Sequence, residues 1–397
     1  MTGGVRIGRI FGIAIHIDWS WLLIVLLITW NLSTAFGQLH PEWGIGLRWG
    51  VALSAALLFF ASVLAHELAH SLTARAQGIP VHSITLFMFG GVSNIQRHPP
   101  SPGAEFVVSI VGPLTSIALG VIFALLAGLS AGGSLVGIAR GTDAGAAVAQ
   151  LSPLSTLLLW LGPVNVLVGI FNMIPGFPLD GGRVLRSILW AVTDDLRRAT
   201  RWASWIGQAI AWLMITAGIA MVFGVRIPFF GEGLINGLWL AFIGWFLNSA
   251  SAESYRQVVV QDVLEGVPVS RIMRSSPPTV PSTSTISNLI YDHVMGTDDH
   301  AFPVMDNGRL LGLVTLDDVR QVARDAWDTT TIREIMTPAQ ELVVATPQED
   351  AADALNKLQE RDVRQLPVLR NDELVGLLRR RDLIRWLQFH SDLNRNR

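Results

Sequence analysis

Six segments of this sequence are long and apolar enough to cross a lipid bilayer as helices. A membrane-spanning helix needs about 20 mostly apolar residues. Only 15% of the 397 residues are charged, whereas typical soluble domains carry about 25%. The pattern predicts a multi-pass α-helical membrane domain and disfavours an ordinary soluble enzyme. The predicted spans lie near Ile17–Leu32, Trp49–Ala69, Phe106–Leu129, Leu154–Met173, Ile206–Val225 and Leu234–Asn248.

The arginines of this apolar half are concentrated in alternate connections between the predicted spans. Arg6 and Arg9 precede the first span. Loops rich in Lys and Arg stay preferentially in the cytoplasm. We therefore predict a cell-membrane protein whose termini and soluble tail are cytoplasmic, which agrees with an even number of spans. The other cationic connections carry Arg75 and Arg97 (spans two to three) and Arg183, Arg186, Arg197, Arg198 and Arg201 (spans four to five).

Three ionisable side chains, His66, Glu67 and His70, lie within five residues of the second apolar segment. Residues i and i+4 share one face of a helix, so the two imidazoles can bind one metal ion. Glu67 can then act as general base on a metal-bound water. The alternative is that both histidines simply hydrogen-bond to neighbouring groups. The apolar setting favours the metal, because unsatisfied polar groups are costly there.

The end of the fourth apolar segment supplies candidates for the rest of such a site. Two prolines and three glycines between Phe171 and Arg183 predict a broken helix. The chain has no cysteine, so any metal ion must be held by histidine and carboxylate side chains. Asp180 in this break is therefore suited to be a third metal ligand. Its alternative role is to cap the following helix. Asn172 either stabilises an oxyanion or caps the break.

The histidine motif, together with Asn172, Pro175 and Leu179–Gly181, resembles the site-2 proteases, which are zinc intramembrane metalloproteases. The resemblance covers residues 1 to about 250. It implies that His66, His70 and Asp180 bind one Zn²⁺, that Glu67 activates water, and that Asn172 stabilises the transition state. It also implies a transmembrane protein substrate that is cut in or near its membrane helix, as in regulated intramembrane proteolysis.

The segment 79–95 is rich in β-branched and aromatic residues. It predicts one or two membrane-associated strands at the cytoplasmic face. Phe89, Gly90 and Gly91 are candidate substrate-binding residues, because an edge strand can pair with an unwound substrate. An equally weighted alternative is that these strands merely close a water-filled cavity and bind no substrate. We interpret the pair Gly112-Pro113 in the third span mainly as a packing kink.

The tail after Val267 contains a sequence repeat with an offset of about 63 to 64 residues. Phe302-Pro303-Val304 corresponds to Leu366-Pro367-Val368, and Gly312–Asp318 corresponds to Gly376–Asp382. Each copy is predicted to contain a strand, an amphipathic helix, two strands joined by a turn, and a final helix. The pattern predicts an α/β tandem module.

This tail resembles a tandem pair of CBS domains. The resulting domain prediction is a six-span protease domain at 1–252, a linker at 253–268, CBS domains at 269–328 and 329–390, and a tail at 391–397. CBS pairs often bind adenine nucleotides, so the resemblance implies ATP, ADP or AMP at Thr315, Asp318 and Asp382. Arg379 replaces the expected hydroxyl residue in the second copy, and could contact phosphate or weaken that site. The alternative is a nucleotide-free module that forms a homodimer.

The combined prediction is a zinc-dependent intramembrane endopeptidase with a CBS tail. Its partners would be a transmembrane protein substrate, the lipid bilayer, an adenine nucleotide and a second copy of the chain. The net charge of −2 gives no indication of nucleic-acid binding. One alternative is a CBS-regulated ion transporter or channel that uses the same polar residues as an ion path. A catalytically inactive membrane scaffold is a third interpretation.

Overall fold

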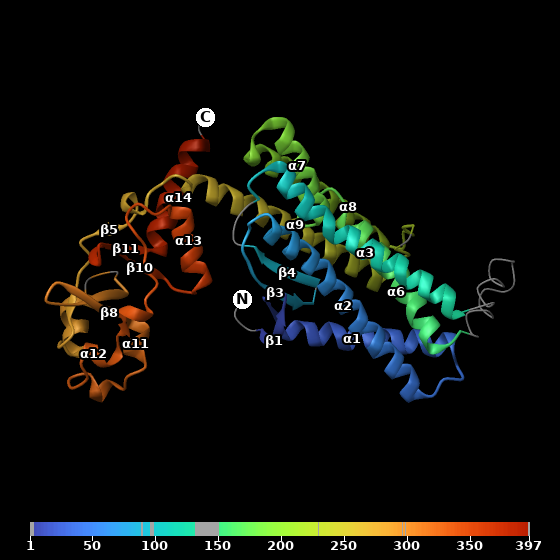
Figure 1. The fold of residues 1–397 in the computed structure, drawn as a ribbon, viewed down its shortest axis with the longest axis horizontal. Helices are drawn as coiled ribbons and strands as arrows, with labels where there is room; N and C mark the ends of the chain where they lie inside the picture. The colour runs from blue at the N-terminus through green and yellow to red at the C-terminus, as the bar shows by residue number, and fades with distance from the viewer. Residues whose placement is uncertain are drawn as a thin grey trace. The chain divides into compact units, whose positions relative to one another are not determined.

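The computed structural model describes residues 4–88, 90–95, 99–131, 151–228, 230–295, 297 and 299–395. The chain forms two compact units, Met1–Arg256 and Gln257–Arg397, each with hydrophobic cores of its own (Figure 1). The first unit is mostly helical. The second unit combines short helices with two small sheets.

Six helices in the described part of the chain are long and apolar enough to cross a bilayer, as predicted. Each overlaps one predicted span, although α2, α3 and α9 extend to 32, 30 and 31 residues. Large apolar side chains such as Leu26 and Trp30 lie exposed on them. Lipid contact explains this exposure, which would be unfavourable in water. The helices are α1 (Trp19–Leu39), α2 (Ile45–Ala76), α3 (Pro102–Ala131), α6 (Pro153–Asn172), α8 (Leu196–Val222) and α9 (Leu234–Leu264).

Glycines allow α3 and α6 to pack closely. A Cβ atom added to Gly120 of α3 would lie 2.7 Å from the carbonyl oxygen of Gly162 of α6. A Cβ atom on Gly169 would lie 2.8 Å from the carbonyl oxygen of Pro113. Small residues permit this backbone approach in membrane helices. The close packing fixes the middle of α3 and the end of α6 relative to each other.

A four-stranded sheet in the order β1-β2-β3-β4 belongs to the first unit (Figure 1). β3 and β4 confirm the predicted strands, whereas β1 and β2 were not predicted. Ile13, Ile15 and Ile84 are buried on one face of the sheet, where they pack against Leu64 and Leu68 of α2. The sheet therefore lies against the helix that carries His66. The strands are β1 (Val5–Ile10), β2 (Ile13–Ile17), β3 (Val81–Phe87) and β4 (Gly90–Ile95).

The predicted break after the fourth span is present. α6 ends at Asn172, and an amphipathic helix, α7 (Asp180–Thr193), begins at Asp180. Between them the chain packs tightly on α8, since a Cβ atom on Gly176 would lie 3.0 Å from the backbone nitrogen of Gly207. α7 packs against both α3 and α8. The break thus places Asp180 at the start of a helix with one buried face.

The second unit contains the predicted repeat. Each copy supplies an antiparallel pair of strands, β7 with β8 and β10 with β11, and a helix that follows each pair. The first copy's β5 pairs with β11 of the second copy, and the second copy's β9 pairs with β8 of the first. The strands are β5 (Arg274–Ser275), β6 (Val280–Pro281), β7 (Ala301–Asp306), β8 (Arg309–Thr315), β9 (Thr337–Pro338), β10 (Gln365–Arg370) and β11 (Glu373–Arg379).

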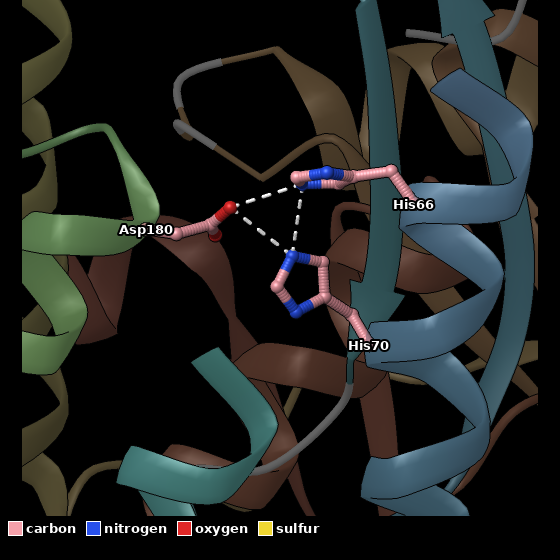
Figure 2. A group of neighbouring side chains, drawn as sticks. All are labelled: His66, His70 and Asp180. Carbon is pink, nitrogen blue, oxygen red and sulfur yellow. Dashed lines mark hydrogen bonds and ion pairs between the residues drawn. The ribbon is translucent and has the colours of Figure 1, made fainter. Parts of the chain in front are cut away.

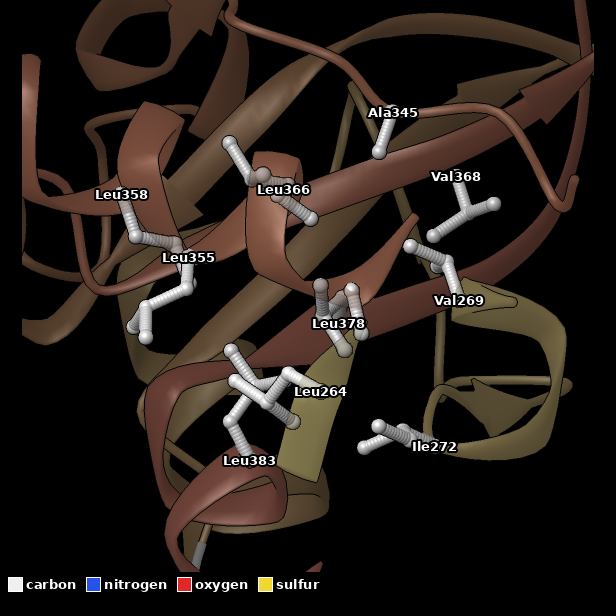
Figure 3. Packing of buried hydrophobic residues seen from close by; sticks show 12 residues of the cluster. Leu264, Val269, Ile272, Ala345, Leu355, Leu358, Leu366, Val368, Leu378 and Leu383 are labelled. Carbon is white, nitrogen blue, oxygen red and sulfur yellow. The ribbon is translucent and has the colours of Figure 1, made fainter. Parts of the chain in front are cut away.

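The helices of this unit cover its sheets and close its cores. Figure 3 shows one core, in which Leu264, from the end of α9, lies with Val269, Leu366 and Leu378. The stretch predicted to be a linker is therefore helical up to Leu264. The helical elements are η1 (Val269–Arg271), α10 (Ile286–Asn288), η2 (Leu289–Val294), α11 (Leu316–Arg320), η3 (Arg324–Ala326), α12 (Ile332–Ile335), η4 (Ala339–Glu341), α13 (Ala351–Glu360) and α14 (Arg380–Arg395).

Candidate metal centre

His66 and His70 of α2 and Asp180 of α7 converge on one point (Figure 2). The two Nε2 atoms lie 3.1 Å apart. Asp180 Oδ2 lies 3.0 Å from His66 Nε2 and 3.1 Å from His70 Nε2. The imidazoles are buried, and the Asp180 side chain is only 13% exposed. The structure thus brings together the three predicted ligands from segments 110 residues apart along the chain.

Hydrogen bonds to α3 orient both imidazoles. His70 Nδ1 lies 2.5 Å from the carbonyl oxygen of Val108, and His66 Nδ1 lies 2.9 Å from the hydroxyl of Ser116. A carbonyl oxygen only accepts, so His70 must carry its proton on Nδ1. Its Nε2 lone pair therefore faces Asp180. Such a bond to the remote ring nitrogen is typical of histidines that bind metals.

The donor set and its spacing fit Zn²⁺. Bonds of about 2.0–2.1 Å in a tetrahedral site would separate ligand atoms by about 3.3 Å. The observed separations of 3.0 to 3.1 Å are close to this value. A carboxylate oxygen and an imidazole lone pair at such short range repel each other unless a cation or a proton lies between them. The arrangement can therefore hold a divalent cation, with two nitrogen ligands and one oxygen ligand.

Glu67 lies beside this cluster and faces β4. The Ser93 hydroxyl of β4 donates to Glu67 Oε2 at 2.7 Å. A Cβ atom on Gly91 would overlap the Glu67 side chain and lie 3.1 Å from its Cδ. β4 is thus in direct contact with the predicted general base. Ser93 was not singled out in the sequence, because a lone serine in a strand carries no recognisable signal.

Gly112 was assigned mainly to packing, but the structure places it against the metal-binding face. A Cβ atom there would overlap the His70 ring and lie 2.7 Å from His66 Nε2. The missing side chain therefore leaves the space in which the imidazoles converge. The Gly-Pro pair is visible in the sequence. Only the packing of α2 against α3, however, shows that Gly112 makes room for the imidazoles and does not merely allow a helix kink.

Arg186 was counted among the cations of a cytoplasmic connection, but it is buried on α7. Its Nε donates to Glu105 Oε1 at 2.7 Å, and its Nη2 donates to the same oxygen. Glu105, in the first turn of α3, is fully buried. This ion pair fixes the Asp180 helix to the helix that orients both histidines. Neither residue was assigned a role from the sequence.

Other predicted site residues are less clearly placed. The Asn172 amide donates to the carbonyl oxygen of Val168 at 3.0 Å, within its own helix. No contact of Asn172 with the three converging side chains is described, so its catalytic role stays a prediction. Gly90 and Gly91 lie in β4, whereas Phe89 lies outside the described residues.

The predicted nucleotide-binding residues differ between the two repeats. Thr315 donates to Asp318 Oδ2 at 2.8 Å and caps α11. Thr315 also lines a cavity of about 510 Å³, to whose lining Asp318 does not contribute. In the second copy, Arg379 binds both carboxylate oxygens of Asp382, at 2.7 and 2.8 Å. The equivalent aspartate is therefore already ion-paired.

The fold and these sites define a class of protein, namely a multi-pass membrane protein with a buried metal-binding cluster and a tandem α/β tail. Residues 54–215 match the peptidase family M50, and residues 269–325 and 332–388 each match the CBS domain. The chain is 35% identical over 359 residues to a protein of Mycobacterium tuberculosis named zinc metalloprotease Rip3. That match covers 90% of this chain and 86% of the relative.

A second curated relative agrees. The chain is 32% identical over 391 residues to Synechocystis zinc metalloprotease sll0528, which covers 98% of this chain and 96% of the relative. The solved site-2 protease from Methanocaldococcus jannaschii is 26% identical, with a TM-score of 0.40, and covers 64% of this chain and 95% of that chain. The family matches and the two curated relatives show that this chain belongs to peptidase family M50, the site-2 proteases, and is a zinc metalloprotease with tandem CBS domains.

Proposed function

We propose that this protein is a zinc-dependent intramembrane endopeptidase that cuts another membrane protein in or near a transmembrane helix. His66, His70 and Asp180 would hold the metal ion, and Glu67 would act as general base. The observation that carries the proposal is the convergence of three metal-binding atoms 3.0 to 3.1 Å apart. Membership of the M50 peptidase family supports hydrolysis as the chemistry.

Zn²⁺ at this site would supply a Lewis acid for the scissile carbonyl and would lower the pKa of a water molecule to about 7. Glu67 accepts the proton of the attacking water and passes it to the departing amide nitrogen. The Ser93 hydroxyl engages one oxygen of the Glu67 carboxylate and so orients the group. Asn172 would stabilise the developing oxyanion only if its amide left its bond to Val168.

We propose that the substrate binds as an extended strand along β4. Peptide bonds in a helix are shielded and already hydrogen-bonded, so a protease must first unwind them. β4 is at the end of the strand order and pairs only with β3 within the described sheet. A strand added there would gain backbone hydrogen bonds near Glu67. Gly90 and Gly91 would form this substrate-binding edge, and Phe89 stays a predicted contributor outside the described residues.

The decisive experiment compares wild type with Glu67→Gln and the exposed control Glu232→Gln. Each variant is co-expressed with candidate membrane proteins, and truncated product is scored. Glu67→Gln should abolish cleavage yet keep its zinc, because Glu67 is not among the proposed ligands. Cleavage at the wild-type rate by Glu67→Gln would contradict the assignment. Ion flux through proteoliposomes without any cleavage would favour the transporter alternative.

We further propose that an adenine nucleotide regulates the protease from the cavity beside Thr315. The volume of about 510 Å³ lies in the range of small-molecule sites. Arg320 and Arg364 line the cavity and can attract a phosphate group. Millimolar AMP or ATP should raise the melting temperature of the tail, because a ligand of the folded form stabilises it. No shift would favour a homodimerisation module without nucleotide.

The arginine distribution supports a topology in which both termini and the CBS tail are cytoplasmic. Cysteine accessibility tests this directly, because the natural chain has no cysteine. Single cysteines at Asp353 in the tail and Glu42 between α1 and α2 should react with impermeant maleimide from opposite sides of the membrane. Labelling of both from one side would contradict this topology.

A further inference from the structure

The repeat relates two equivalent positions between the CBS copies, called here the first and the second cleft, which are built from different residues. Because β5 and β9 are exchanged between the copies, Leu313 pairs with Thr337 in one sheet and Leu377 pairs with Arg274 in the other. The repeat offset therefore relates residues of the first cleft to residues of the second. The equivalent pairs are Thr315 and Arg379, Thr337 and Arg274, Asp317 and Arg381, and Val363 and Asp299.

The first of these clefts is an open cavity. Thr315, Asp317, Thr337 and Val363 all line the volume of about 510 Å³. The two threonines are small and leave space between the copies. This is the cleft assigned above to an adenine nucleotide.

In the second cleft, the equivalent residues bind one another. Arg274 Nη1 donates to Asp299 Oδ2 at 2.5 Å. Arg379 Nη1 and Arg381 Nη2 donate to Asp299 Oδ1 at 2.7 and 3.1 Å. The Asp299 side chain is only 7% exposed. Three guanidinium groups therefore surround one buried carboxylate, in the place where the first copy has a cavity.

The charges of this cluster are those of a phosphate-binding site. Arg274, Arg379 and Arg381 all contact Asp299, and Arg379 also contacts Asp382. Guanidinium groups bind phosphate oxygens through paired hydrogen bonds, in the same way as they bind carboxylate oxygens. A ligand that entered would have to displace the largely buried Asp299 carboxylate from its arginine partners, which is unfavourable.

We propose that the second cleft is a phosphate-type anion site closed from within by Asp299, so that the CBS pair binds one adenine nucleotide rather than two. The single nucleotide occupies the first cleft, and this part rests on the nucleotide regulation proposed above. The closure of the second cleft does not depend on it. Loss of the Asp299 charge would leave three arginines without their shared carboxylate and open the site to an inorganic anion.

Calorimetric titration of the full-length protein in detergent tests this, with AMP and inorganic pyrophosphate as separate probes. Wild type should bind one equivalent of AMP and no pyrophosphate in the tail. Asp299→Asn should bind one added equivalent of pyrophosphate with at least a tenfold gain in affinity. The control Asp353→Asn removes an exposed carboxylate of the same unit and should behave as wild type. Because all variants share one metal centre, pyrophosphate bound there appears equally in every titration.

Two results would overturn the closed cleft, namely two equivalents of AMP in wild type or no pyrophosphate gain in a folded Asp299→Asn. Circular dichroism establishes folding, and Asp299→Ser is the replacement if the amide is not tolerated. Absence of AMP binding in wild type, together with the pyrophosphate gain in Asp299→Asn, would refute nucleotide regulation and leave the closed cleft supported.

Discussion

At the residue scale, the space in front of the imidazoles depends on the absence of one side chain. Gly112 of α3 lies where a methyl group would overlap the His70 ring. His70 is held on its other side by Val108, so it cannot turn away without losing that hydrogen bond. Sequence reasoning found the three ligands because their chemistry is unusual in an apolar helix. It favoured a packing role for Gly112 over a role in shaping the metal cavity, because a glycine in a membrane helix has many packing roles.

We predict that Gly112→Ala loses most of its bound zinc while the protein still inserts and folds. The added methyl group forces the two imidazoles apart, so that they no longer converge with Asp180. Metal analysis of the purified protein measures this directly. Gly128→Ala is a matched control on the same helix, because a Cβ atom there meets no atom within 4 Å. Full zinc occupancy in Gly112→Ala would show that the site accommodates a side chain.

A second residue-scale prediction concerns Asp299. Burial alone would raise its pKa, but Arg274, followed by Arg379 and Arg381, lowers the pKa below the usual value. A carboxylate whose pKa is lowered by folding stabilises the folded protein at pH values above its unfolded-state pKa, which is about 3.9 for Asp. This stabilisation is lost as the pH falls through the folded-state pKa. Melting temperatures of wild type should therefore exceed those of Asp299→Asn at pH 6. The difference should shrink steadily below about pH 4, and a constant difference would contradict the linkage.

At the scale of elements, the pairing of Glu105 with Arg186 links α3 to α7 and so orients Asp180. Arg186 does lie between the fourth and fifth spans, as predicted, but its sequence position shows its charge and not its partner, 81 residues away. β1 and β2 were missed for a related reason. Five- and six-residue strands next to an apolar span give little periodicity, and their burial depends on α2. The long apolar helices and the break before Asp180, by contrast, were predictable from local composition.

We predict that Arg186→Met destabilises the membrane unit by about 3–5 kcal/mol, because it leaves the Glu105 carboxylate buried without its partner. Zinc should then be lost faster to a chelator, since Asp180 is less well positioned. The double variant Glu105→Leu/Arg186→Met removes both charges and should recover much of the stability. Thermal unfolding in detergent and zinc-release kinetics measure the two effects. Equal stability of the single and double variants would argue against a coupled pair.

The contact of β4 with Glu67 gives a further element-scale prediction. Gly91→Ala should lower cleavage at least tenfold while zinc content stays unchanged, because the added Cβ displaces the Glu67 side chain but not the ligands. Gly103→Ala is the control, because it makes the same substitution outside the sheet and a Cβ atom there meets no atom within 4 Å. Cleavage assays on a common substrate compare the variants. Loss of zinc in Gly91→Ala would mean that the sheet supports the ligands instead.

At the scale of the whole molecule, the chain joins two units with separate cores. The order of the membrane-spanning helices in the first unit and of the repeated strand pairs in the second followed from the sequence, because apolar length and the internal repeat are local patterns. The exchange of β5 and β9 between the copies did not, because two-residue strands have no sequence signature.

We predict that removal of zinc by a membrane-permeant chelator stops cleavage and lowers the melting temperature of the membrane unit only. The metal-binding residues all lie before Arg256, so the tail gains no stability from the metal ion. Differential scanning calorimetry should resolve the tail transition and show it unchanged. Addition of Zn²⁺ should restore both activity and the first transition. A shift of the tail transition on chelation would reveal coupling between the units.

The exchanged strands β5 and β9 also determine what a shortened chain could do. A protein truncated before Ile332 would retain β8 without β9, and the isolated second repeat would lack β5 beside β11. Each fragment would expose an unsatisfied sheet edge, which promotes aggregation. Half of the tail is therefore not expected to fold as a smaller domain. We therefore expect the two repeats to unfold together in one cooperative transition.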